Sequence, residues 1–128
     1  MMDRAGNGDL YATAPGLFSG YSVYQIDQAA LSATSLHSVT STSTGGVGLA
    51  VDPSGTSVWV AGFIGFSLNV VLEQIDLTTG AVVTTHNTLG GNMWGLAFDG
   101  AGNLYSTMQG ATAPQLIQID TVTGVPTL

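Results

Sequence analysis

Cysteine is absent from the 128-residue sequence, and basic residues are almost absent. Without a thiol, the chain can form no disulfide, has no cysteine nucleophile and offers no cysteine ligand to zinc. Lysine and arginine together contribute one residue, Arg4, against eight acidic residues, which gives a formal net charge of −7. A single cation cannot neutralise several phosphates, so we expect no nucleic-acid binding and no attraction to anionic membranes.

Charge as a whole and long apolar runs are also scarce. Only 7% of the residues are charged, and no apolar run approaches the roughly 20 residues of a membrane-spanning helix. The first residues lack the basic start and the apolar stretch of a secretory signal, so we expect no signal peptide in this chain. Hydrophobic residues nevertheless make up 45% of the sequence, with Val, Ile, Tyr and Trp at regular spacing. This composition predicts a folded all-β protein rather than a disordered one.

Two short motifs recur along the chain with one period. Residues 95–105 are predicted to form strand, tight turn and strand, since Gly and Asn supply the positive φ angles of the turn. Their Asp99 has counterparts at Asp52 and Asp3, at steps of 47 and 49 residues. A Gln-Ile-Asp motif recurs at residues 25–27, 74–76 and 118–120. A period in the forties with four short strands per unit is typical of β-propeller blades.

The repeats predict one partial propeller unit with blade copies at about 1–44, 45–91 and 92–128. In the first copy only Met1 and Met2 remain of the innermost strand, which would leave eleven strands where three whole blades have twelve. Closed propellers usually have four or more blades, and an open flank exposes apolar faces and an unpaired strand edge. Two hypotheses remain. Two copies close a six-bladed ring, or the chain is part of a longer propeller.

The turn motifs also carry a family resemblance. The Gly-Leu-Ala-Phe-Asp segment at 95–99 followed by Asn-Leu-Tyr, and the Ile-Asp-x-x-Thr-Gly turns at 75–80 and 119–124, resemble the repeats of NHL and YVTN β-propellers. These are secreted bacterial propellers related to six-bladed lactonase-like and lyase-like proteins. The resemblance covers nearly the whole chain and implies the propeller fold and an extracellular or periplasmic location. It implies no single activity, because such propellers include enzymes, ligand binders and adhesion modules.

The acidic residues are predicted to serve turns rather than chemistry. Side chains of Asp at the start of a hairpin turn accept hydrogen bonds from backbone amides two residues on, and repeat-equivalent carboxylates lie a blade's width apart. This applies to two repeat sets, which are Asp3, Asp52 and Asp99, and Asp27, Asp76 and Asp120. Glu73 is expected to lie in solvent. We therefore predict no metal, no cofactor and no catalytic residue.

The two histidines, His37 and His86, are also repeat equivalents, 49 residues apart near the ends of outer strands. We expect them to be exposed and not to share a metal, because no further ligand stands at a suitable spacing. The sequence contains neither the Gly-x-Ser-x-Gly motif of a nucleophilic serine nor the lysine of a phosphate-binding loop.

Aromatic and apolar residues gather in the loops predicted at the propeller face where ligands usually bind. Clustered residues of this kind would form a contact patch for a ligand or partner, and the alternative is that they pack under their own loops or across blades. The candidates are Phe18, Phe63, Phe66, Asn92 and Trp94. The aromatic residues of the second strands are expected to pack between blades, and these are Tyr11, Trp59 and Tyr105.

These observations favour a non-catalytic β-propeller repeat module for protein or ligand interaction, which completes a ring by self-association as a homodimer. The alternative is a fragment of a calcium-dependent lactonase-like or lyase-like enzyme, which would need carboxylates converging on one face. A third hypothesis is that the chain is a gene fragment or an engineered piece without a function of its own.

Overall fold

The computed structural model describes residues 1–17, 19–44, 46–67, 69–89, 93–109 and 112–128. Within these residues the fold is all-β, with three four-stranded antiparallel sheets. Sheet 1 contains β1 Met2–Arg4, β2 Leu10–Pro15, β3 Tyr21–Asp27 and β4 Ser32–Val39. Sheet 2 contains β5 Gly48–Val51, β6 Ser57–Phe63, β7 Val70–Asp76 and β8 Val82–Leu89. Sheet 3 contains β9 Met93–Phe98, β10 Leu104–Gln109, β11 Pro114–Ile119 and β12 Pro126–Thr127. No helix in the described part of the chain is long and apolar enough to cross a membrane.

Each sheet is a meander, because consecutive strands are joined by short turns that suit antiparallel neighbours. The β5–β6 hairpin shows how the sequence makes such a turn. Its Asp52 Oδ1 accepts a hydrogen bond from the amide of Ser54 at 2.9 Å, and Gly55 takes a left-handed φ of 72°. Asp and Gly thus supply the two requirements of a tight turn, a local acceptor and freedom at positive φ.

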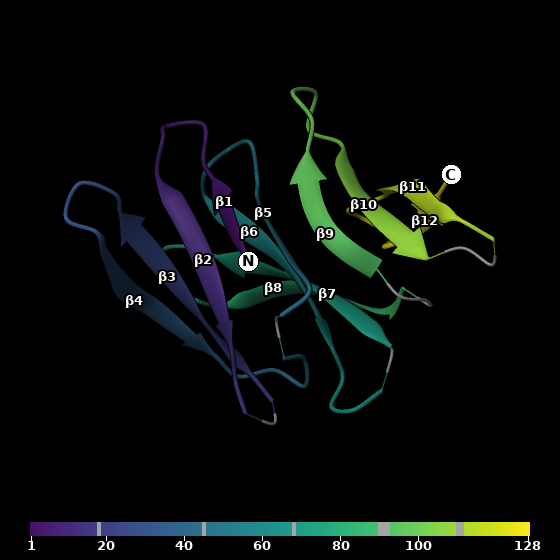
Figure 1. The fold of residues 1–128 in the computed structure, drawn as a ribbon, viewed down its shortest axis with the longest axis horizontal. Helices are drawn as coiled ribbons and strands as arrows, with labels where there is room; N and C mark the ends of the chain where they lie inside the picture. Colours follow the sequence, from purple (N-terminus) through teal and green to yellow (C-terminus); the bar gives the residue numbers. More distant parts are fainter. Residues whose placement is uncertain (18, 45, 68, 90–92, 110–111) are drawn as a thin grey trace.

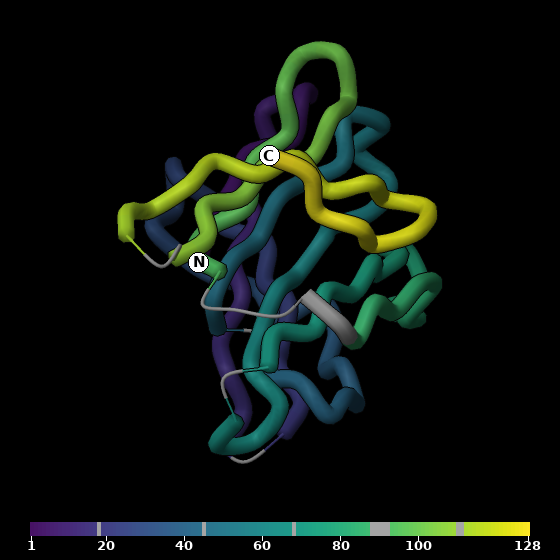
Figure 2. The backbone as a smooth tube through the Cα atoms, turned by 90° about the vertical axis from the view of Figure 1, so that its right-hand side faces the viewer, coloured from purple at the N-terminus to yellow at the C-terminus, as the bar shows by residue number. Residues whose placement is uncertain are grey.

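The innermost strands of the three sheets lie side by side, and β5 contacts both β1 and β9. Figure 1 shows the sheets spreading outward from these strands, and the hairpins that follow β1, β5 and β9 lie at one end, the top of the picture. Figure 2 shows the same three hairpins together at the top from the side. This is the arrangement of consecutive propeller blades.

Hydrophobic cores fill the two junctions between sheets. The core between sheets 1 and 2 is made chiefly by Tyr11, Tyr21, Val23, Leu49, Val51, Val58, Val60 and Ile75. The core between sheets 2 and 3 is made chiefly by Ala50, Trp59, Leu72, Met93, Leu104, Ile117 and Ile119. Sheet 2 is therefore covered on both faces, whereas sheets 1 and 3 each have one face in a core and one open flank. The predicted packing between blades is confirmed for Tyr11 and Trp59. For Tyr105 it was wrong, because this residue is half-buried on the open flank of sheet 3.

The first hairpin differs from the prediction in its register. Asp3 lies within β1 opposite Tyr11, and the turn begins at Ala5, whose amide binds the carbonyl of Asp9. The repeat equivalence of Asp3 with Asp52 was wrong, because matching aspartates by identity shifted the first copy by two residues. The expected total of eleven strands was also wrong. β1 is a paired strand of three residues, shorter than the six of β9.

Candidate functional site

The predicted contact patch is brought together only in part. Phe63 and Trp94 meet edge to face, with ring centroids 6.3 Å apart and planes at 80°. Both belong to strand ends rather than loops, since Phe63 ends β6 and Trp94 is the second residue of β9. Phe66 stands fully exposed in the turn after β6. Phe18 and Asn92 lie outside the described residues.

Trp94 also belongs to the open flank of sheet 3. Residues paired across antiparallel strands share a face, and Trp94 pairs with Thr107 and Ala97 with Tyr105. These residues and Leu116 line a shallow groove of about 240 Å³. Trp94 is 53% and Leu116 64% exposed. The aromatic contact between sheets 2 and 3 therefore continues into an uncovered apolar face.

Three acidic residues lie around a hollow of about 270 Å³ at the end of the inner strands. Asp3, Asp52 and Asp99 all line it, together with Arg4. The repeat equivalents Asp52 and Asp99, which bind the amides of their own turns, therefore border the same hollow, and Asp3 joins them from within β1. In the described part of the chain, however, no three acidic or histidine side chains are grouped closely enough to hold a metal. Asp3 bridges two blades, because its Oδ2 accepts the amide hydrogen of Val51 at 2.7 Å.

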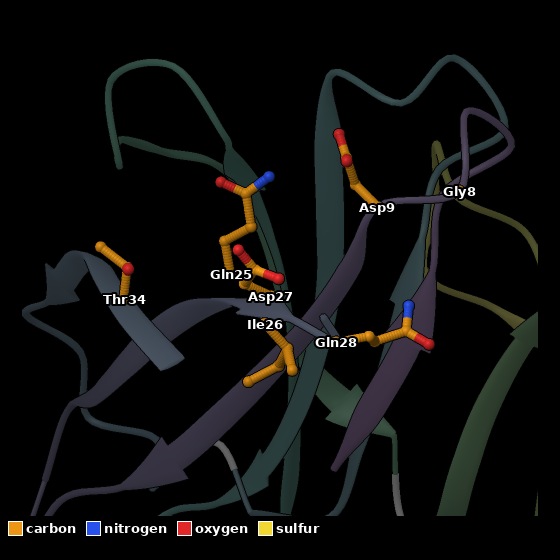
Figure 3. Close-up of a pocket in the computed structure, with 7 residues that line it drawn as sticks. All are labelled: Gly8, Asp9, Gln25, Ile26, Asp27, Gln28 and Thr34. Carbon is orange, nitrogen blue, oxygen red and sulfur yellow. The ribbon is translucent and has the colours of Figure 1, made fainter. Parts of the chain in front are cut away.

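A larger hollow of about 420 Å³ lies between the turns of sheet 1. Figure 3 shows the side chains of Asp9, Gln25 and Asp27 pointing upward and that of Ile26 pointing downward, and all four residues line the hollow. The corresponding place in sheet 3 is a smaller hollow of about 210 Å³ that includes Gln118. The hollow thus recurs with the Gln-Ile-Asp motif, and it is a feature of the blade's turns.

The glutamine of this motif ties the turns of a blade together. Gln74 Nε2 donates to Ser57 Oγ at 3.0 Å in sheet 2, and Gln118 Nε2 donates to Asn103 Oδ1 at 3.2 Å in sheet 3. The aspartate of the motif accepts hydrogen bonds from the backbone amides of the turn that follows it. The motif is therefore explained by blade architecture alone.

Glu73 is buried between sheets 1 and 2, so its expected exposure was wrong. Its side chain is 4% exposed. Tyr21 donates its hydroxyl hydrogen to Oε2 at 2.9 Å, and Ser41 donates to Oε1 at 2.7 Å. Burial, followed by the charge of Glu73 and the hydrogen bond to it, raises the pKa of Tyr21 far above its ordinary 10.0, so the hydroxyl keeps the proton that it donates. The network joins two blades.

The histidines are half-buried at blade junctions, so their expected exposure was also wrong. His37 Nε2 donates to the carbonyl of Leu77 at 2.8 Å, and its ring covers Gly80 in the hairpin of sheet 2. His86 repeats this contact one blade on, with Nε2 3.1 Å from the carbonyl of Thr121. Its ring also stacks on Trp59, with centroids 6.1 Å apart. Each histidine therefore joins its blade to the next one by a hydrogen bond to a turn carbonyl and a ring contact with a turn glycine. We call this pair of contacts the histidine clasp.

Acid is expected to weaken the Asp-Gly hairpins. Hydrogen bonds from the amides of Thr79 and Thr78 lower the pKa of the Asp76 carboxyl below its ordinary 3.8, and the pKa of Asp120 is lowered in the same way. A carboxyl with a depressed folded-state pKa stabilises the fold above the unfolded-state pKa, and this stabilisation is lost as the pH falls through the folded-state value.

We therefore expect thermal scans to show a Tm that falls between about pH 5 and pH 2, the range in which such carboxyls become protonated. The fall should be smaller in Asp76→Asn/Asp120→Asn than in the unmodified chain. An equally steep fall in that variant would contradict the assignment.

Comparisons with known proteins establish the fold and leave the family open. No protein-family model matches the chain, and no curated protein matches it. Among solved structures, a gluconolactonase from Xanthomonas campestris superimposes with a TM-score of 0.62 at 16% identity, over 98% of this chain and 44% of that one. The calcium-binding protein regucalcin from Agrobacterium tumefaciens superimposes with a TM-score of 0.59 at 16% identity, over 100% of this chain and 43% of that one. TolB from Acinetobacter baumannii superimposes with a TM-score of 0.62 at 17% identity, over 92% of this chain and 28% of that one.

These similar structures are six-bladed propellers, and the chain spans less than half the length of each. The chain is therefore a β-propeller segment. The NHL and YVTN resemblance stays a prediction, because identities this low show the fold alone.

Proposed function

We propose that the chain is a non-catalytic β-propeller module for interaction with a protein or ligand, and that it completes its ring with a second copy. The observation that carries the non-catalytic part is the use of the carboxylates. Each of the eight acidic residues accepts a hydrogen bond from within the chain. They are Asp3, Asp9, Asp27, Asp52, Glu73, Asp76, Asp99 and Asp120.

The proposed contact surface is the aromatic end, which we define as Phe63, Phe66 and Trp94. Phe63 is anchored by the core between sheets 2 and 3, and it supports the ring of Trp94. A half-buried aromatic anchor beside exposed apolar side chains is typical of contact surfaces, because little conformational entropy is lost on binding.

Ring closure is proposed from the number of sheets and their open flanks. Three sheets are half of a six-bladed ring, and the chain spans 43–44% of two six-bladed structures. A second copy would supply the missing half. The proposal predicts a dimer of twice 13.0 kDa in solution, and the solution mass measured across protein concentration tests it.

The second candidate function is a calcium-dependent enzyme fragment. One observation favours it, namely that Asp3, Asp52 and Asp99 line one hollow at the end of the inner strands. Calcium prefers six to eight oxygen ligands, and carboxylates are its usual protein ligands. The hydrogen bonds already made by Asp3 and Asp99 weigh against this use.

Calcium therefore separates the two candidates. The non-catalytic proposal predicts the same Tm in millimolar calcium and in chelator. A site occupied at 100 times its Kd would add about 2.7 kcal/mol of stability, or a Tm rise of roughly 10 °C for a domain of this size. Such a rise, abolished by Asp52→Asn, would favour the enzyme fragment.

A further inference from the structure

The open flank of sheet 3 repeats the residue pattern of the faces that are buried inside the chain. Tyr105 stands where sheets 1 and 2 have Tyr11 and Trp59, which are 7% and 3% exposed. Leu116 stands where those sheets have Val23 and Leu72, both 0% exposed. Leu116 itself is 64% exposed. The flank therefore has the side chains of a blade junction without the neighbouring blade.

The open flank of sheet 1 supplies the opposite half of such a junction. Leu10 and Ile26 pair across β2 and β3 and face away from the core of Tyr11 and Val23. They occupy the positions of Val58 and Ile75 in sheet 2, both of which are buried against sheet 1. Met2, on the same flank, is 64% exposed.

The β3–β4 hairpin also distinguishes this flank from the internal junctions. Gly80 takes a left-handed φ beneath the His37 ring, and a Cβ there would lie 2.6 Å from that ring; Gly124 is covered by His86 in the same way. Leu31 occupies this place in sheet 1, with φ 52°. A histidine placed as His37 and His86 are would clash with the side chain of Leu31, so the blade that packs on this flank must lack one. The sequence has two histidines, in sheets 1 and 2, so sheet 3 carries none.

We infer that the open flank of sheet 3 docks onto the open flank of sheet 1 of a second copy, head to tail, in a junction without a histidine clasp. We call this contact between the two open flanks the seam. The inference rests on the proposed self-association and specifies the surface through which it occurs. Two identical seams related by a twofold axis through the centre of the ring would close it. The groove of Trp94, Tyr105 and Leu116 then receives Leu10 and Ile26 of the second copy.

A pair of introduced cysteines tests the seam, because the chain has no cysteine of its own. At the internal junction, Asp3 and Val51 approach closely enough for a 2.7 Å hydrogen bond. Their repeat equivalents at the seam are Ala97 and Arg4. Mild oxidation of the Ala97→Cys/Arg4→Cys variant should give a cross-linked dimer on a non-reducing gel. Ala97→Cys/Ser35→Cys, with one cysteine moved to exposed β4, should not.

A charge placed in the seam gives the second test. Leu116→Glu should weaken dimerisation at least tenfold, whereas Val122→Glu, an equal change at an 84% exposed turn residue outside the seam, should leave it unchanged. A stable dimer with neither cross-link nor sensitivity to Leu116→Glu would overturn the seam and leave self-association intact. A monomer at every concentration would overturn both. Cross-linked species larger than dimers would contradict the closed ring of two copies and would indicate an open assembly of chains joined by the same seam.

Discussion

Replacing Gly80 by alanine lowers the free energy of unfolding by about 3 kcal/mol, of which roughly 1–2 is the left-handed backbone and the rest overpacking. The backbone at Gly80 has φ 74°, and a Cβ would lie 2.6 Å from the His37 ring. The ring is held in place by its hydrogen bond to Leu77, so it cannot move aside freely. Denaturant unfolding followed by Trp fluorescence measures the loss.

Gly55 provides the matched control. It has φ 72° and no heavy atom within 4 Å of the added Cβ. Gly55→Ala should therefore show the backbone effect alone, about 1–2 kcal/mol. In a His37→Ala background, the loss of unfolding free energy caused by Gly80→Ala should fall toward the same value. If Gly80→Ala is no more harmful than Gly55→Ala, the histidine clasp does not pack as described.

Removing the Tyr21 hydroxyl has the second large effect. Tyr21→Phe should lower the free energy of unfolding by about 1–3 kcal/mol, because a buried carboxylate loses one of its hydrogen-bond donors. Glu73 lies 4% exposed and keeps only the bond from Ser41 among the hydrogen bonds that its side chain accepts in the described structure. Urea titrations of the variants measure the loss.

The double variant distinguishes a network from simple packing. Ile117 occupies in sheet 3 the position that Glu73 has in sheet 2, and it is buried at 1% exposure. Tyr21→Phe/Glu73→Ile replaces both partners by apolar groups, and it should recover most of the loss of Tyr21→Phe. Additive losses in the double variant would show that Tyr21 and Glu73 do not act as a pair.

The strands and turns could be predicted because they follow from local chemistry. Asp52, Asp76 and Asp120 each start a turn and bind its amides, as their spacing to glycine indicates. The same local logic failed at Asp3. Its hairpin turn begins at Ala5 instead, and matching by residue identity could not reveal that shift.

The contacts between blades could not be predicted from the sequence alone. Glu73 and Tyr21 are 52 residues apart, and His37 and Leu77 are 40 apart, so only the stacking of sheets brings them together. One signal was present. His37 and His86 recur in step with a hairpin glycine of the following blade, and that pairing indicates a contact across the junction.

The contact patch was predicted from aromatic residues in loops. Its outcome also separates local features, which the sequence indicates, from contacts between blades, which it does not. Phe63 and Trp94 do meet, but they do so because β6 and β9 end side by side at a blade junction. Phe66, on the turn beyond β6, remains fully exposed. Side chains in strands take positions fixed by register, whereas those in turns do not.

Light scattering on a sizing column, repeated over a hundredfold range of protein concentration, tests ring closure most directly. We predict a species of twice 13.0 kDa that persists on dilution to the micromolar range, because two seams must break together for the ring to open. A compact species of 13.0 kDa at every concentration would contradict the account, since the flanks of sheets 1 and 3 would then be stable in water without a neighbouring blade.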